Sequence, residues 1–132
     1  MFDNKLKGSF EADYINANEG DDKLFGGGGA DVLTGGKGSD RFVYRNYKES
    51  RQGAQYRDVI TYFSSSEADK IDLSSIGKDF VFIGSSVFSG DQPEIRFENG
   101  ILQLATAGFN HSPLFEIQLL GVDSLTIDDL IL

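Results

Sequence analysis

The stretch that decides the fold, residues 8–43, divides into four rows of nine: GSFEADYIN (8–16), ANEGDDKLF (17–25), GGGGADVLT (26–34) and GGKGSDRFV (35–43). The sixth position of every row is an aspartate: Asp13, Asp22, Asp31 and Asp40. The eighth position is always large and apolar: Ile15, Leu24, Leu33 and Phe42. A fixed period of this length is typical of a repeat architecture in which each row forms one structural turn.

Glycine is concentrated in the same stretch, since nine of the 16 glycines lie between Gly8 and Gly38. Glycine adopts positive φ angles that residues with a Cβ resist, so the glycines at the start of a row predict a tight turn. The aspartate then ends the turn, and a three-residue strand follows whose middle side chain points inward. Repetition of this unit predicts a flattened right-handed coil with two stacks of turns and two short parallel sheets.

Successive turns of such a coil lie on opposite sides, so each turn faces the turn two rows away. Carboxylate and backbone carbonyl oxygens then converge between the turns, and a flexible cage of about six oxygens suits Ca²⁺ better than Mg²⁺ or a transition metal. We expect one cage between Asp13 and Asp31 and another between Asp22 and Asp40. The further expected contributors are the carbonyls of Gly26, Gly28, Gly35 and Lys37, the carboxylate of Asp58 at a last site facing turn 35–40, and, less favoured, Glu49.

Two other interpretations of the glycine-rich stretch are weaker. A flexible linker has no reason to keep an aspartate and an apolar residue at fixed positions over four rows. A phosphate-binding loop is suggested by 26–29, but no Gly-Lys-Ser/Thr follows and the strand–helix context is absent.

The composition narrows the class of protein. The chain has 132 residues, 39% of them hydrophobic, with 11 Phe and 5 Tyr, which predicts one folded domain and not a disordered tail. With 21 acidic against 12 basic residues and a net charge of -9, the chain lacks the basic footprint of a nucleic-acid binder and suits a protein that collects cations. It contains no cysteine, which excludes disulfides and thiolate metal sites. No apolar run approaches the ~18 residues of a membrane-spanning helix, and the N-terminus does not resemble a signal peptide.

The remainder of the chain alternates apolar and polar residues at strand spacing. Strands are expected at 58–63, 70–73, 80–83, 94–98, 101–105, 114–120 and 125–132. Asn99-Gly100 is a strong hairpin signal, and no helical periodicity extends beyond two turns. We therefore predict an all-β fold: a right-handed parallel β-roll of nonapeptide repeats (1–45), continued by an antiparallel β-sheet or sandwich cap (46–132) in one continuous domain. A cap is required because an open roll exposes an unpaired strand edge and its apolar interior.

The rows at 26–43 resemble the GGxGxDxUx nonapeptide of RTX calcium-binding proteins. The rows at 8–25 are less regular, since Glu11 and Ala17 stand where the family has glycine. The segments FVY (42–44), ESR (49–51), DVITYF (58–63) and DKIDLSSIG (69–77) resemble the serralysin-type C-terminal domain of type I secreted bacterial proteins. Two departures are Tyr62, where that family commonly has aspartate, and the loop 105–113, which lacks its aspartates, so no calcium site is expected there.

This resemblance implies a secreted, extracellular domain of a larger exported protein that folds when it binds calcium outside the cell. The resemblance also implies an uncleaved C-terminal signal that a type I exporter reads, here DLIL (129–132). The chain has no Lys or Arg after Arg96, and Asp129 precedes the apolar end. An ordinary terminal strand at 125–132 is compatible with the same residues. The implied partners are calcium, the exporter and the catalytic domain of the parent chain.

The chain offers little for catalysis and one open basic cluster. His111 is the only histidine and no HExxH is present, so no active site is expected. The chain also resembles the R-modules of mannuronan C5-epimerases, which implies that acidic polysaccharide such as alginate is a possible ligand. The residues that would contact it are Arg41, Arg45, Lys48, Arg51 and Arg57. A solvated face that offsets nearby carboxylates is the alternative interpretation of this cluster.

Overall fold

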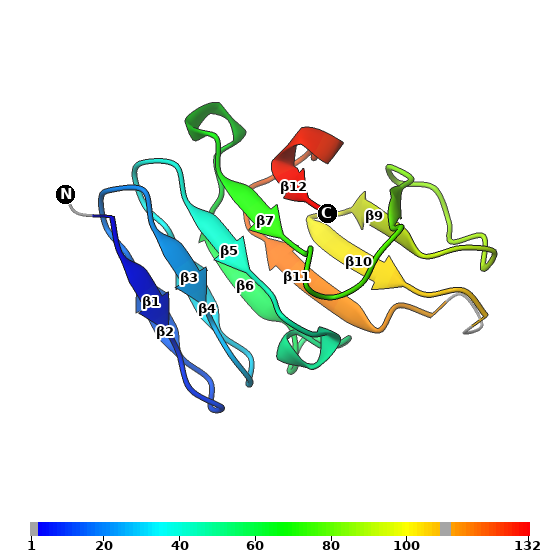
Figure 1. Ribbon diagram of the computed structural model, residues 1–132, viewed down its shortest axis with the longest axis horizontal. Coiled ribbons are helices and arrows are strands. Elements are labelled where there is room, and N and C mark those ends of the chain that lie inside the picture. Colours follow the sequence, from blue (N-terminus) through cyan, green and yellow to red (C-terminus); the bar gives the residue numbers. More distant parts are fainter. Residues whose placement is uncertain (1–2, 109–111) are drawn as a thin grey trace.

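The fold is two β-sheets laid face to face, described by a computed structural model for residues 3–108 and 112–132. The five-stranded sheet has the order β1 (Lys5–Lys7), β3 (Lys23–Phe25), β5 (Arg41–Val43), β7 (Lys70–Asp72) and β12 (Leu130–Ile131). The seven-stranded sheet has the order β2 (Tyr14–Asn16), β4 (Val32–Thr34), β6 (Asp58–Tyr62), β11 (Phe115–Leu119), β10 (Ile101–Ala105), β9 (Glu94–Glu98) and β8 (Val81–Phe82). In Figure 1 the five-stranded sheet lies in front of β2, β4 and β6.

The first five strands form the expected roll, because the chain changes sheet after every strand. Odd-numbered strands pair in parallel with Leu6 opposite Leu24 and Leu24 opposite Phe42. Ile15 is opposite Leu33 in the other sheet. The middle side chain of each strand points between the sheets, and the two flanking side chains point outward, as the period-2 geometry of a strand requires. The predicted all-β roll is confirmed.

The parallel pairing continues past residue 45. β6 pairs with β4, and β7 pairs with β5, so Ile60 and Ile71 extend the two columns of inward-facing apolar residues. Among the described strands, the antiparallel pairs are β9 with β10 and β10 with β11, and β11 joins the roll in parallel with β6. The expected hairpin at Asn99-Gly100 connects β9 to β10, with positive φ angles of 51° and 77° at its two residues.

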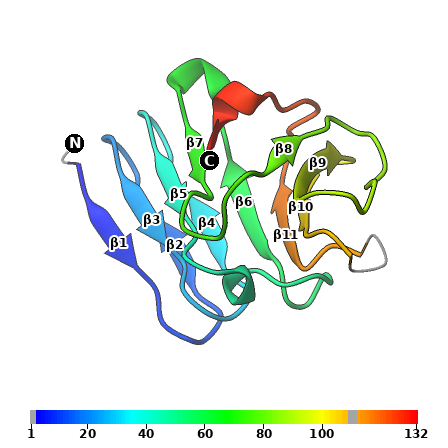
Figure 2. The same cartoon turned by 45° about the vertical axis from the view of Figure 1, so that its right-hand side comes forward.

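The core fills the space between the sheets along their whole length. Its fully buried members include Leu24, Leu33, Phe42, Ile60, Ile71, Ile95, Leu102, Leu104, Phe115 and Ile117. At the first turns, Leu6 and Ile15 are only partly buried. Figure 2 shows why: β1 is the free edge at the N-terminal end of the roll, whereas the C-terminus lies beside β7.

The last eight residues differ from the strand that the sequence predicts. Residues Ile127–Asp129 form a 3-10 helix, and only Leu130–Ile131 (β12) pair as a strand with β7. The helix starts there because the Asp129 carboxylate accepts a hydrogen bond of 2.9 Å from the backbone N–H of Thr126. Throughout the described part of the chain, no helix has the length and apolar character that crossing a bilayer needs.

Candidate metal centre

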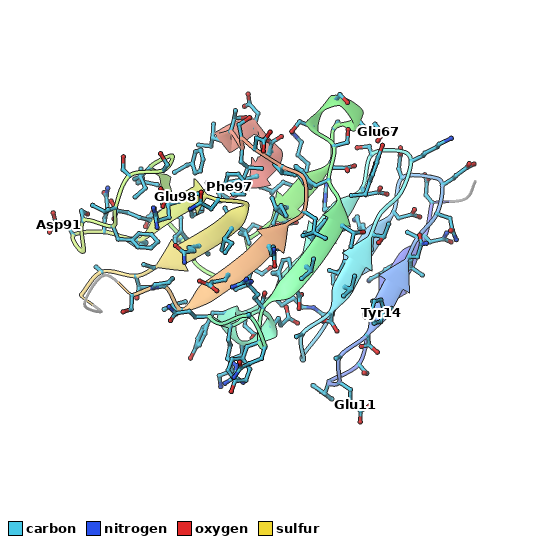
Figure 3. The ribbon with its side chains drawn as sticks, turned by 180° about the vertical axis from the view of Figure 1, so that it is seen from behind. Glu11, Tyr14, Glu67, Asp91, Phe97 and Glu98 are labelled. Atoms are coloured by element: carbon cyan, nitrogen blue, oxygen red, sulfur yellow. The ribbon has the colours of Figure 1, made fainter. Side chains whose placement is uncertain are left out.

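The repeat aspartates stack in two columns on opposite turn edges of the roll. We call these the Asp31 column, made of Asp13, Asp31 and Asp58, and the Asp40 column, made of Asn4, Asp22, Asp40 and Asp69. In Figure 3, Glu11 marks the edge that carries the Asp31 column, and Glu67 marks the edge that carries the Asp40 column. The two pairs expected from the sequence, Asp13 with Asp31 and Asp22 with Asp40, are therefore neighbours within the columns.

Within each column, one carboxylate oxygen is held by the backbone of the preceding turn. Asp31 Oδ1 accepts a hydrogen bond of 2.8 Å from the N–H of Asp13, and Asp40 Oδ1 accepts one of 3.0 Å from the N–H of Asp22. The same bond recurs at Asn4–Asp22 (2.7 Å), Asp31–Asp58 (2.9 Å) and Asp40–Asp69 (2.8 Å). Each aspartate thus has a fixed orientation before any ligand arrives.

The aspartates fall into two groups according to whether their second carboxylate oxygen, Oδ2, accepts a hydrogen bond. Asp22, Asp31 and Asp40 are each 1% exposed, and their Oδ2 atoms are buried without a hydrogen-bond partner in the described structure. A buried carboxylate oxygen without a partner is costly, because the group has lost water and gained nothing in exchange. These three atoms therefore favour binding of a positively charged ligand at this position.

In the other three aspartates, the protein itself supplies the partner. Asp13 Oδ2 accepts a hydrogen bond of 2.7 Å from the N–H of Ser9. Asp58 Oδ2 accepts one of 2.9 Å from the hydroxyl of Tyr44, and Asp69 Oδ2 accepts one of 2.9 Å from the N–H of Ser64. The free oxygens thus lie in the middle of the roll and the satisfied ones toward its ends.

Burial also changes the acidity of these groups. Loss of hydration, together with the charge of Asp13, raises the pKa of Asp31 to about 7. Desolvation, with the charges of Asp69 and Asp22, raises the pKa of Asp40 to about 7. Desolvation likewise raises the pKa of Asp58 to about 8. A divalent cation removes the repulsion and favours the ionised carboxylates, so it acts against all of these shifts.

The glycines keep space open beside the free oxygens. A Cβ placed on Gly26 would lie 2.5 Å from Asp31 Oδ2 and 3.3 Å from Asp58 Oδ2. A Cβ on Gly35 would overlap Asp40 Oδ2. Each of these turns therefore forms a cradle around a carboxylate oxygen that any other residue would fill.

The donor set of the cradles fits a hard cation. Among residues 3–108 and 112–132, no three Asp, Glu, His or Cys side chains converge as a metal-binding group. Most ligands must therefore be backbone carbonyl oxygens, which calcium accepts readily together with one or two carboxylates. The carbonyl contributors expected from the sequence belong to the turns that end in these carboxylates: Gly26 and Gly28 precede Asp31, and Gly35 and Lys37 precede Asp40.

One expected placement is wrong. Asp58 does not face turn 35–40, because β6 pairs with β4 and carries Asp58 into the Asp31 column. Asp69 takes the position above Asp40 instead. Glu49 lies in the 3-10 helix Tyr47–Glu49, where its Oε1 accepts a hydrogen bond of 2.6 Å from the N–H of Arg45. Its charge is one of the causes that raise the pKa of Asp31 and Asp58.

The sequence contains a signal for Asp69 that lies outside the nine-residue period. In each complete row, the aspartate is two residues before the inward-facing apolar residue. The same Asp-x-apolar pattern occurs at Asp58 before Ile60 and at Asp69 before Ile71, outside the nine-residue period. Tyr44 and Ser64, which complete the last two carboxylates, carried no comparable signal.

The residues of the expected basic cluster lie along β5 and the connection from β5 to β6. Arg41 begins β5, and Arg45 follows this strand, with its guanidinium 4.9 Å from the ring centre of Phe25. Arg51 stacks on Tyr56, and Arg57 pairs with Glu116 of β11 at 3.3 Å. The fifth member, Lys48, lies in the 3-10 helix that follows Arg45. His111, the one histidine, lies outside the described residues.

Comparisons with known proteins agree with this geometry. Residues 3–42 match the RTX calcium-binding nonapeptide repeat in 4 copies. The fold is similar to the R2 subunit of the mannuronan C5-epimerase AlgE6 from Azotobacter vinelandii, with a TM-score of 0.64, 27% identity, and coverage of 98% of this chain and 87% of that one. It is also similar to the R3 subunit, with a TM-score of 0.60, 23% identity, and coverage of 98% and 78%.

A comparison with curated protein sequences produced no match. RTX nonapeptide repeats bind calcium, which is the cation that the buried carboxylates and turn carbonyls of this chain suit. Residues 3–42 are therefore a calcium-binding RTX repeat array, carried in the β-roll fold that this chain shares with mannuronan C5-epimerase R-modules.

Proposed function

We propose that this chain is a non-catalytic C-terminal domain of a larger secreted bacterial protein, which folds when calcium binds outside the cell. Residues 1–45 and 46–132 would act as roll and cap of one continuous domain. The calcium ligands are the carboxylates of the two columns together with the turn carbonyls: Asp13, Asp22, Asp31, Asp40, Asp58, Gly26, Gly28, Gly35 and Lys37. Asp69, which the sequence interpretation omitted, joins the carboxylates.

The observation that carries this proposal is the group of buried Oδ2 atoms on Asp22, Asp31 and Asp40, which accept no hydrogen bond from residues 3–108 and 112–132. Without a cation, these carboxylates oppose folding by desolvation and mutual repulsion. A ligand that binds only the folded state stabilises it by mass action. The gain is about 2.7 kcal/mol for one site when the free ligand concentration is 100 times the Kd. Extracellular modules bind calcium at roughly 10⁻⁴–10⁻³ M, so cytosolic calcium would leave the roll unfolded.

The C-terminal end supports export before folding. Asp129 is 6% exposed, its Oδ1 accepts a hydrogen bond of 2.7 Å from the Ser65 hydroxyl, and β12 pairs with β7. Two of the four residues of a signal at 129–132, Asp129 and Leu130, are thus buried in the folded domain and become accessible when the chain unfolds. An exporter that reads this ending would act on the calcium-free form.

The central test is a calcium titration followed by far-UV circular dichroism and thermal melting. We expect the parent chain to gain strand signal and melting temperature with calcium and to lose both with a chelator. The double variant Asp31→Ala, Asp40→Ala should lose most of this response. The control, Asp91→Ala with Asp123→Ala, removes the same charge from exposed positions, and Figure 3 shows Asp91 at the end of the molecule farthest from β1 and β2. A parent chain equally ordered with and without chelator contradicts the proposal.

Export is tested separately by co-expression with a type I exporter. The full chain is expected in the culture medium, and a chain lacking 129–132 is expected to remain in the cells. Equal export of both chains would show that the ending is only a strand.

A second candidate function, binding of an acidic polysaccharide, is favoured by a basic row on the outer face of the five-stranded sheet. The row consists of Lys5, Lys23, Arg41 and Lys70, which are opposite one another on four adjacent strands. Adjacent strands are ~4.8 Å apart, a spacing suited to a linear chain with one carboxylate per sugar. Phe25 lies beside this row, with the amino groups of Lys5 and Lys7 at 5.3 and 5.8 Å from its ring centre.

Titration with oligouronates at saturating calcium tests this candidate. Arg41→Ala with Arg45→Ala is expected to weaken binding. Arg51→Ala tests another expected contact, and because the Arg51 side chain stacks on Tyr56 and is not part of the row, this variant is expected to weaken binding less. Absence of binding to the parent chain, or equal binding by both variants, removes the candidate.

A further inference from the structure

Tyr44 links the end of the Asp31 column to the cap. Its side chain is 2% exposed, and its hydroxyl donates a hydrogen bond of 2.9 Å to Asp58 Oδ2. Its ring meets the ring of Phe115 edge-on, with centroids 5.2 Å apart and planes at 84°. Its backbone N–H donates to the carbonyl of Asp72, at 3.0 Å. One residue directly after β5 therefore contacts a repeat-column carboxylate, strand β7 and the first residue of β11.

Asp58 and Asp31 point their second oxygens at the same glycine. The Cβ position of Gly26 lies 2.5 Å from Asp31 Oδ2 and 3.3 Å from Asp58 Oδ2. Asp31 is 1% exposed, and its Oδ2 has no hydrogen-bond partner in the part of the chain that the structure describes. The two carboxylates therefore converge on the Gly26 cradle, where Asp31 Oδ2 is available to bind a cation.

The other contacts of Asp58 leave this arrangement little freedom. Its backbone N–H donates to the Ser50 hydroxyl at 2.8 Å, and its Oδ1 accepts from the N–H of Asp31 at 2.9 Å. The Tyr44 hydroxyl then sets the direction of Oδ2. A carboxylate oxygen has two lone pairs, so accepting one hydrogen bond leaves one for a cation.

We propose that Tyr44 is a positioning residue whose hydroxyl aims Asp58 Oδ2 at a calcium ion shared with Asp31 Oδ2 and ties that ion to the cap through Phe115. This inference rests on the proposed calcium function and deepens it, since Tyr44 and Asp58 lie outside the matched repeat residues 3–42. The Asp40 column lacks such a link: at its end, Asp69 Oδ2 accepts from the backbone N–H of Ser64.

The first test is Tyr44→Phe in the full chain, which keeps the ring against Phe115 and deletes the hydroxyl. Isothermal titration with calcium is expected to show one site weakened by about 10- to 100-fold, the usual effect of removing a hydrogen bond to a metal ligand, with the other sites unchanged. Melting temperature should fall in calcium and change little in chelator. The control is Tyr14→Phe, which alters an exposed ring on the outer face of β2 (Figure 3).

A second variant, Asp58→Asn, keeps an acceptor for Tyr44 and removes the charge. It is expected to lose the same calcium site, and the double variant should lose no further site. Unchanged calcium binding by either single variant overturns the role of Tyr44, as does a Tyr44→Phe melting temperature that falls equally in calcium and in chelator. A parent chain that binds no calcium fails the proposed function itself, a result distinct from a parent that binds calcium and variants that bind it identically.

Discussion

The middle of the roll, with Asp22, Asp31 and Asp40, and its C-terminal closure, with Asp58 and Asp69, contain the same ladder of stacked aspartates. The two regions differ in what satisfies the second carboxylate oxygen. In the middle, Asp22, Asp31 and Asp40 each have one buried carboxylate oxygen that accepts no hydrogen bond from the described residues. At the closure, Asp58 accepts a hydrogen bond from the hydroxyl of Tyr44, and Asp69 accepts one from the N–H of Ser64. The closing carboxylates are therefore partly satisfied by the protein and keep a lone pair for a cation, whereas the middle ones depend on the cation alone. Folding of the middle should therefore depend more strongly on the solvent.

The cap beyond the closure depends still less on ions. β9, β10 and β11 are five-residue antiparallel strands, longer than the three-residue strands of the repeats. Their inward-facing side chains, such as Leu102, Leu104 and Phe115, are apolar and fully buried. Hydrophobic burial therefore stabilises this end regardless of calcium, at about 1.5–3 kcal/mol for each large side chain.

Chelation should produce the largest difference between the two regions. We expect the amide protons of 17–43 to lose protection by about 100-fold or more when calcium is removed. This factor corresponds to one site in a free calcium concentration of 100 times its Kd. The amides of 94–119 should retain most of their protection. Hydrogen exchange measured by mass spectrometry, with calcium and with chelator, checks both expectations. Equal loss in the two segments would show that roll and cap unfold as one unit, and equal protection in both conditions would contradict a calcium-dependent roll.

A glycine substitution should have the next largest effect, and a matched pair separates packing from backbone strain. Gly36 has φ 84°, and a Cβ there would overlap the carbonyl oxygen of Asn18 in the neighbouring turn. Gly84, in the cap, has φ 65° and open space around its Cβ position. We expect Gly84→Ala to cost about 1–2 kcal/mol from the left-handed conformation alone. Gly36→Ala should cost more, because two turns must also separate.

Urea unfolding in saturating calcium measures both free energies. If the two variants lose the same stability, the turns of the roll tolerate separation, and the close approach of their backbones has no energetic role.

The sequence predicted the repeating part well for a simple reason. When turn length is constant, a nine-residue period places partners 18 residues apart, as found for Asp13 with Asp31 and for Asp22 with Asp40. Inward-facing residues and columns then follow by counting. The hairpin at Asn99-Gly100 was also predictable from the local sequence alone, because a turn with two successive positive φ angles favours that dipeptide.

Beyond residue 43 the nine-residue period no longer predicts which residues pair, although the two aspartate columns continue. Asp31 pairs with Asp58 across 27 residues, and Asp40 pairs with Asp69 across 29. Loops of different length connect these strands, and lengthening a surface loop costs little free energy, so the period disappears while the structure persists. The same reasoning explains the misplaced Asp58: its spacing from the array did not reveal which edge its strand would join.

The pH dependence of stability gives the smallest expected effect in the comparison of the middle of the roll with its closure. It distinguishes proton binding from calcium binding at the same carboxylate oxygens. In the calcium-free fold, burial raises the pKa of Asp31 and Asp40 from 3.8 to about 7. The folded state therefore holds protons that the unfolded chain releases between these values, and the stability of the calcium-free chain should fall as pH rises from about 4 to 7. The raised pKa of Asp58, about 8, extends the decline slightly further.

Calcium should reverse this trend, since it binds the ionised carboxylates and displaces their protons. Calcium affinity is expected to rise with pH up to about 7 and then level off. The gap in melting temperature between calcium and chelator should therefore widen across the same interval. In Asp31→Asn with Asp40→Asn the decline of the chelated melting temperature between pH 5 and 7 should become shallower, because two of the groups that bind the extra protons are gone and Asp58 remains. A parent chain whose chelated form grows more stable toward pH 7 would mean that these aspartates are already ionised and paired, so that the middle of the roll is completed by the protein as its closure is.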